Sequence, residues 1–323
     1  MKAKTIFVTC MAAAIALNAA VPTPSDAEPQ LAGIVSIAPY ADLSAKATSF
    51  GMLIGNPVVP ALMLASIQQS VVATHGRFRS DLPAYVAAYM DKDGRNDMAV
   101  VYPSVDRIAR MALAHPGSER QGKDTLHLLP TERNPHDRYA VFAEDNMFTA
   151  FASSAELARR ALADCQPSAK ESLPLLRLAL RQPALKKKPS GALGLTPTNV
   201  TALLDGFVRL DLSLDLTERG LALAFSGVRE AATPEPGLKK RLEGQLRSAF
   251  KGLCGDDEKL MPSVTVDTKP GGAVTGEVLI SEEQLKGLGK DFNSFVSTQM
   301  SGALSTGKDA EDGKAKAKKK SKD

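Results

Sequence analysis

The stretch from Val208 to Leu216, with the sequence VRLDLSLDL, carries the clearest structural pattern in this chain of 323 residues. Every second residue is apolar, and the residues between them are charged or hydroxylic. Because successive side chains of a strand point to opposite faces of its sheet, the pattern predicts a strand with one buried and one solvated face. The turn Glu218-Arg219-Gly220 then leads into a second apolar strand. The pair predicts an antiparallel sheet.

Elements of the same kinds lie on both sides of this strand pair. A helix is predicted from Leu238 to Leu253, because its leucines recur at helical spacing. Two further strands lead into a helix that opens with the capping box Ser281-Glu282-Glu283-Gln284. Strand-strand-helix units are also predicted at residues 83–115 and 138–163. This order predicts an α+β fold, with antiparallel sheets built from repeated strand-strand-helix units, helices packed on one face, and two halves.

The first 27 residues have the features of a cleaved signal peptide. Lys2 and Lys4 precede an uncharged, alanine-rich stretch that is too short for a comfortable membrane span. Ser25 and Ala27 form a small-x-small pattern, which predicts cleavage before Glu28; cleavage after Ala20 is the alternative. We therefore expect a secreted or periplasmic protein with no transmembrane anchor.

Composition divides the remaining chain into two predicted domains and a tail. The run KKKPSG at residues 186–191 is predicted to be a solvated connector between an N-terminal α+β domain, residues 28–185, and a C-terminal ββαββα domain, residues 192–305. Residues 306–323 contain almost no apolar side chains and are predicted to be disordered.

The positive charge of the chain belongs to its two ends. The formal net charge is +4. Residues 1–27 contribute +1, from two lysines and one aspartate, and residues 306–323 contribute +3, from seven lysines and four acids. The remainder, residues 28–305, is therefore neutral, and we expect no nucleic-acid partner. The tail is interpreted as a solubilising segment or as a weak tether to an anionic surface. The lysines of such a tether are Lys314, Lys316, Lys318, Lys319, Lys320 and Lys322.

One internal segment resembles a membrane segment in its composition. Residues 47–74 carry no charged side chain. Gly55-Asn56-Pro57 breaks the segment into two pieces, each shorter than a membrane span. We expect a helical hairpin or bent helix, with Asp42 as its N-cap, packed over a sheet as part of the core. The alternative is a segment that binds a membrane surface or a partner.

Two cysteines remain after the leader, Cys165 and Cys254. In an oxidising compartment such a pair is often a disulfide, and closing this loop would stabilise the fold by about 4 kcal/mol in the chain-entropy model. Two separately buried thiols are the alternative.

No sequence motif for catalysis stands out. The chain lacks a nucleophile elbow, a zinc-protease motif, a phosphate loop and a dinucleotide-binding motif, and we expect no cofactor. The most specific hypothesis for chemistry is an acid-base or metal site in which a hairpin brings together four residues. They are Asp124, His127, His136 and Asp137. Ordinary surface or capping histidines are the alternative. Tyr85 and Tyr89 fall on one strand face and suggest either a small contact surface or sheet packing.

Several short runs resemble a family of exported bacterial proteins of unknown function. They span most of the chain after the leader: Asp81-Leu82-Pro83, Val100-Val101-Tyr102-Pro103, Tyr139-Ala140-Val141-Phe142, Ser153-Ser154-Ala155-Glu156-Leu157 and Arg219-Gly220-Leu221. The chain departs from the family at Leu82, where the family has arginine. The resemblance implies an envelope or secreted location and no known activity.

Together these features predict an exported, non-enzymatic binding protein of the bacterial envelope or the extracellular space. It would act through a protein or cell-surface partner, including the surface of a host cell. The alternatives are a hydrolase with a site near His127 and His136, and a protein that associates with the membrane surface.

Overall fold

The computed structural model describes residues 29–91, 96–129, 137–144, 147–166, 173–182, 206–231, 236–254 and 261–287. The predicted leader, connector and lysine-rich tail lie outside the described residues, as does His136.

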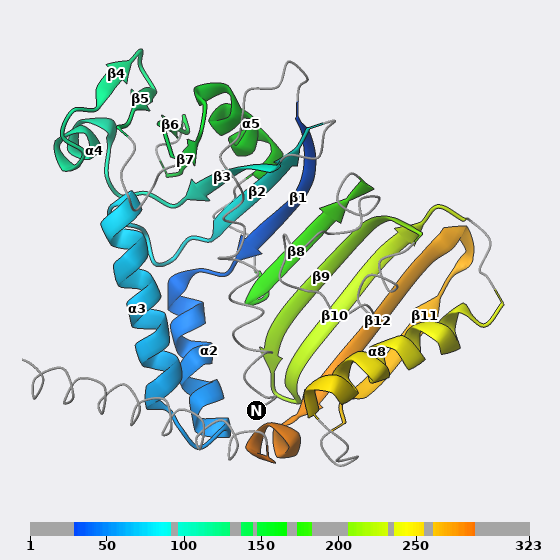
Figure 1. The fold of residues 1–323 in the computed structure, drawn as a ribbon. Coiled ribbons are helices and arrows are strands. Elements are labelled where there is room, and N and C mark those ends of the chain that lie inside the picture. The colour runs from blue at the N-terminus through cyan, green and yellow to red at the C-terminus, as the bar shows by residue number, and fades with distance from the viewer. Residues whose placement is uncertain are drawn as a thin grey trace, which may run out of the picture.

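A single antiparallel sheet of twelve strands organises the described residues, in the order β11-β12-β10-β9-β8-β1-β2-β3-β7-β6-β5-β4 (Figure 1). The strands are β1 (Gln30–Ile37), β2 (Ala84–Met90), β3 (Asn96–Tyr102), β4 (Glu119–Gln121), β5 (Thr125–His127), β6 (Tyr139–Phe142), β7 (Thr149–Ala152), β8 (Leu176–Arg181), β9 (Phe207–Thr217), β10 (Gly220–Arg229), β11 (Ser263–Thr268) and β12 (Ala273–Ser281). The predicted α+β class with antiparallel pairing is therefore confirmed.

Helices lie between these strands. They are α2 (Tyr40–Leu53), α3 (Val58–His75), α4 (Ile108–Ala114), α5 (Ala155–Cys165) and α8 (Leu238–Cys254), with a short 3-10 turn, η2, at Pro270–Gly272. The N-terminus of α5 is capped by Ser154, because the Leu157 amide donates a hydrogen bond of 3.2 Å to the hydroxyl of Ser154.

The alternating stretch forms β9, and it pairs with β10 across the predicted turn. The pairing shifts register next to Val228, so that Val228 faces Arg209 while Arg229 faces Phe207. Val208 is the extra residue of this bulge. The bulge places Phe207 in the core together with Leu210, although the strict alternation would have turned Phe207 toward solvent.

The sheet continues across the predicted domain boundary. β8, from the N-terminal segment, pairs with β9, from the C-terminal segment, and also with β1. The repeated strand-strand-helix units and the separation into two halves are not confirmed, because strands from both segments share one hydrogen-bonded sheet.

Helices α5 and α8 cover opposite faces of this sheet, so the prediction of helices on one face is wrong. Helix α5 packs on the cluster that contains Ala87 of β2. Ala87 faces Ile34 of β1, which faces Ala179 of β8. The next residue, Leu180, points to the other face and belongs to the cluster covered by α8. Each helix buries an apolar area on its own face, which a one-sided arrangement would leave exposed.

We expect the turn between β9 and β10 to tolerate only glycine at Gly220. Its φ is +129°, and an added Cβ would lie 2.1 Å from the carbonyl oxygen of Ile280. Gly220→Ala should therefore lower the free energy of unfolding by about 2–4 kcal/mol. Gly122→Ala is the control, because Gly122 also has a positive φ but an added Cβ would meet nothing within 4 Å. It should cost about 1 kcal/mol. Equal urea-unfolding midpoints for the two variants would contradict the prediction.

Candidate functional site

The uncharged segment forms a helical hairpin that projects from the sheet (Figure 1). Helices α2 and α3 lie side by side, and the chain turns between them at the predicted Gly55-Asn56-Pro57. Asp42 lies in the first turn of α2 rather than at its N-cap, which is Pro39. Among the described residues, no helix has the length and apolar character needed to cross a membrane.

The tip of the hairpin is closed by its own backbone. The amides of Ile54, Gly55 and Asn56 donate to the carbonyl oxygens of residues 50, 52 and 51, at 3.0, 3.1 and 2.8 Å. Gly51 makes this closure possible, because a Cβ there would lie 2.6 Å from Cα of Pro57. The turn therefore has paired amides and a tightly packed backbone.

Helix α2 is the inner helix of the hairpin. Phe50 and Leu53 pack against the apolar cluster under α8 and are partly buried. The ammonium group of Lys46 forms an ion pair with Asp215 of β9, which ties α2 to the sheet. The prediction of core packing holds in part for these two apolar side chains.

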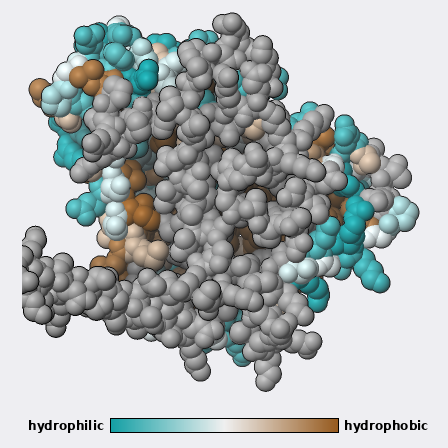
Figure 2. All heavy atoms as spheres, viewed as in Figure 1, coloured by the Kyte–Doolittle hydropathy of each residue, from teal (hydrophilic) through white to brown (hydrophobic). Residues whose placement is uncertain are grey.

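The tip exposes large apolar side chains to solvent, and for these the prediction of core packing is wrong. Met52 is 68% exposed, Val58 59% and Leu62 60%. Figure 2 shows apolar side chains gathered over the hairpin. The reason is geometric, because α3 packs mainly against α2 and lies outside it, so that its outward face has no neighbouring element among the described residues.

The outward face of α3 changes character along its length. Its exposed residues are Val58, Ala61, Leu62, Ala65, Ser66, Gln69, Ser70 and Ala73. They are spaced three and four apart, as one face of a helix requires. The half near the tip is apolar, and the half near the base is mainly polar. The hairpin is thus amphipathic along its axis rather than around it.

A partly buried histidine anchors the base of the hairpin. Nε2 of His75, the last residue of α3, donates to Oδ2 of Asp137 at 3.0 Å. Its ring packs edge-on against Phe151, with centroids 4.6 Å apart, and lies 5.6 Å from the ring of Tyr102. Nδ1 of His75 is buried and has no hydrogen-bond partner in the described part of the chain.

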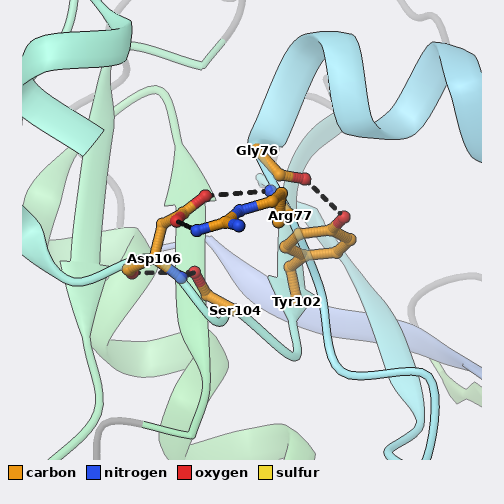
Figure 3. Close-up of polar contacts among 5 residues, drawn as sticks. All are labelled: Gly76, Arg77, Tyr102, Ser104 and Asp106. Atoms are coloured by element: carbon orange, nitrogen blue, oxygen red, sulfur yellow. Dashed lines mark hydrogen bonds and ion pairs between the residues drawn. The ribbon is translucent and has the colours of Figure 1, made fainter. Parts of the chain in front are cut away.

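The segment that follows α3 is held by a second set of polar contacts (Figure 3). The hydroxyl of Tyr102 donates to the carbonyl oxygen of Gly76 at 2.9 Å. The amide and guanidinium of Arg77 donate to the two carboxylate oxygens of Asp106 at 3.0 and 3.2 Å. Ser104 holds the backbone of Asp106 in place through hydrogen bonds of 3.0 and 3.2 Å. The base is therefore fixed to β3 and to the segment after it, while the tip is exposed.

The predicted acid-base or metal site is not assembled by the described residues. His127 stacks on Tyr139, Asp137 pairs with His75, and His136 lies outside the described residues. Asp124 accepts a hydrogen bond from Thr125 at 2.9 Å. Burial alone would raise the pKa of Asp124, but this hydrogen bond and the charge of Arg159 lower it. Within the described ranges, no three His, Cys, Asp or Glu side chains are grouped to hold a metal.

Two other predictions concern buried side chains. Tyr85 and Tyr89 are buried in the core under α5, which supports sheet packing over a contact surface. Cys165 is a free thiol, and burial together with Asp164 raises its pKa to about 12. The side chain of Cys254 lies outside the described residues.

Sequence reasoning missed the base of the hairpin. His75 and Asp137 are 62 residues apart, as are many pairs that never meet, and no motif links them. The Lys46 to Asp215 pair spans 169 residues. Only the uncharged run and its Gly-Asn-Pro break were visible in the sequence.

Comparisons with known proteins add little to this geometry. No family model matches the chain, and no curated protein matches it. Solved structures that resemble it include crystal forms I and III of TP0453. The matches cover 82% and 83% of this chain and 98% of the other chain, at identities of 11% and 13% and TM-scores of 0.36 and 0.35. Likeness at TM-scores this low carries no argument about function.

We expect Gly51→Ala to open the hairpin tip, because the new methyl would overlap the backbone of Pro57. Hydrogen exchange of the Asn56 amide should become about tenfold faster or more. Gly244→Ala, in α8, is the control, because nothing lies within 4 Å of a Cβ added at Gly244. It should leave the exchange rate of the Asn56 amide unchanged. An unchanged Asn56 rate in Gly51→Ala would contradict the described turn.

We expect His115, at the end of α4, to make stability depend on pH. Burial and the neighbouring His75 lower the pKa of His115 from its ordinary value of 6.5. The unfolded chain therefore binds the proton more readily, so stability present above pH 6.5 is lost as the pH falls below it. His115→Gln should reduce the fall in melting temperature between about pH 7.5 and pH 5.5. An identical fall in both proteins would contradict this.

Proposed function

We propose that the protein is an exported binding protein of the bacterial envelope and acts through the apolar tip of the α2–α3 hairpin. The observation that carries the proposal is the exposure of Met52, Val58 and Leu62 on a hairpin whose base is anchored by polar contacts. The uncharged sequence of the segment and the predicted leader support it.

Exposed apolar groups of this size are unfavourable in water. Covering one such side chain recovers about 1.5–3 kcal/mol. Scattered apolar residues on a surface are ordinary, but here three of them gather at the end of one projecting element. Grouped exposure of this kind marks a surface that meets another surface.

The anchored base makes the tip a positioned surface. His75 is held by Asp137, and Arg77 is held by Asp106, at the point where the hairpin returns to the sheet. The other end of the hairpin is tied by the Ala41 amide, which donates to the carbonyl oxygen of Ser80 at 2.9 Å. Both ends are thus fixed, and the apolar tip is presented in one place relative to the sheet.

Binding to isolated envelope membranes tests this function. We expect Leu62→Asp to reduce the bound fraction about tenfold or more, because a carboxylate at a covered apolar position must be desolvated. Co-sedimentation of the purified protein with the membranes measures the change.

Leu113→Asp is the matched control. Leu113 is 84% exposed, more than Leu62, but it lies on α4 rather than on the hairpin. It should leave binding and melting temperature unchanged. Equal binding by wild type and Leu62→Asp would refute the proposed function.

A further inference from the structure

We propose that the occupant of the hairpin tip is the apolar surface of a lipid bilayer, and that the tip inserts into one leaflet. This inference rests on the proposed function and names the partner. The hairpin would act as a reversible anchor that holds the sheet domain at a membrane surface.

The charge of the hairpin matches an uncharged occupant. Residues 47–74 contain no acidic or basic side chain. The nearest cations at the base, Lys46 and Arg77, are already paired with Asp215 and Asp106. The segment 47–74, which contains the tip, therefore offers no charge that hydrocarbon would have to desolvate, and the two cations that flank it are engaged with carboxylates.

Several polar groups near the tip are paired within the hairpin. The hydroxyls of Thr48 and Ser49 donate to carbonyl oxygens of their own helix, at 3.0 and 3.1 Å. The amides of the turn at residues 54–56 are also paired. Pro57 and Pro60 have no amide hydrogen to satisfy. In hydrocarbon each unpaired polar group would cost several kcal/mol, so this internal pairing suits lipid.

A protein interface would use different groups. Protein partners commonly exchange about one hydrogen bond per 100–200 Å² and surround an apolar centre with a polar rim. The large exposed side chains of the tip, Met52, Val58 and Leu62, carry no hydrogen-bond donor, and the exposed hydroxyls of Thr48 and Ser49 are bonded to their own helix. Hydrocarbon needs no such pairing, which favours lipid over a protein as the occupant.

The length of the apolar part sets the depth of insertion. Val58 to Ala65 spans about 12 Å at about 1.5 Å per residue. This is less than half of the hydrocarbon core, which is about 30 Å thick. Beyond Ala65 the outward face becomes polar at Ser66, Gln69 and Ser70, and these residues would lie among the headgroups. The tip thus reaches into one leaflet only.

The absence of tryptophan makes a direct experiment possible. The chain contains no Trp, so Met52→Trp introduces a single reporter at the tip. The processed chain, with its N-terminus verified by mass, is mixed with neutral phosphatidylcholine vesicles. We expect a blue shift of the emission and quenching by brominated lipid. Leu113→Trp is the control and should show neither.

A second variant measures the contribution of the tip to binding. Leu62→Asp should lower the partition into the same neutral vesicles by about tenfold or more, whereas Leu113→Asp should leave it unchanged. Because the interaction is apolar, binding should persist at high salt and should not require anionic lipid. Melting temperatures show whether either variant fails to fold.

Four outcomes would overturn the lipid assignment. The first is the absence of a blue shift in Met52→Trp while envelope membranes still bind in a Leu62-dependent way; the occupant is then a protein, and the proposed function stands. The second is Leu62-dependent self-association without vesicles, which makes the occupant a second copy. The third is binding that requires anionic lipid and is lost at high salt, which indicates the lysine-rich tail. The fourth is equal effects of Leu62→Asp and Leu113→Asp, which removes the hairpin from both proposals.

Discussion

The pairing of β1 with β2 is the constraint on which the projecting hairpin depends. Ile37, the last residue of β1, faces Ala84, the first residue of β2, so residues 38–83 must leave the sheet and return to the same place. An antiparallel neighbour requires no crossover over the sheet. The chain therefore forms two helices that run out and back. The inner one, α2, meets the core through Phe50 and Leu53, whereas α3 meets it near the base of the hairpin, through Val71 and His75. The exposure of α3 follows from this connection.

The same constraint explains why both ends of the hairpin carry its polar contacts. Where the chain leaves β1, the Ala41 amide is bonded to Ser80, and where it returns, His75 and Arg77 meet Asp137 and Asp106. His75 and Asp137 are partly buried, so their pair is worth more than one on an open surface, whereas Arg77 and the Ala41–Ser80 hydrogen bond are exposed to water. The tip is closed by backbone hydrogen bonds around Gly51. The hairpin is therefore anchored at its base and exposed at its tip.

Much of the sheet could be predicted from the sequence, because period-two alternation and turn residues are local signals. β9, its turn at Gly220 and the break at Gly55-Asn56-Pro57 were all visible in this way. The sequence could not predict which face of the sheet each helix covers, because this depends on the register across β2, β1 and β8. The exposure of the hairpin was also hidden, since an uncharged apolar segment has the same composition in a core and on a surface. The partly buried pair of His75 and Asp137 joins distant segments and leaves no local pattern.

The side chains that stabilise the fold and the side chains exposed at the hairpin tip are different sets. The core clusters lie between the sheet and α5, α8 and α4, and α3 contacts them near its base, through Val71 and His75. Side chains at the tip thus contribute little to the stability of the sheet, and their character is set by what they meet outside the molecule. A core helix needs an apolar stripe on one side, whereas the outward face of α3 is apolar at one end. The change from apolar to polar side chains therefore runs along the helix axis, from tip to base. This is the arrangement expected of an element that enters a membrane tip first.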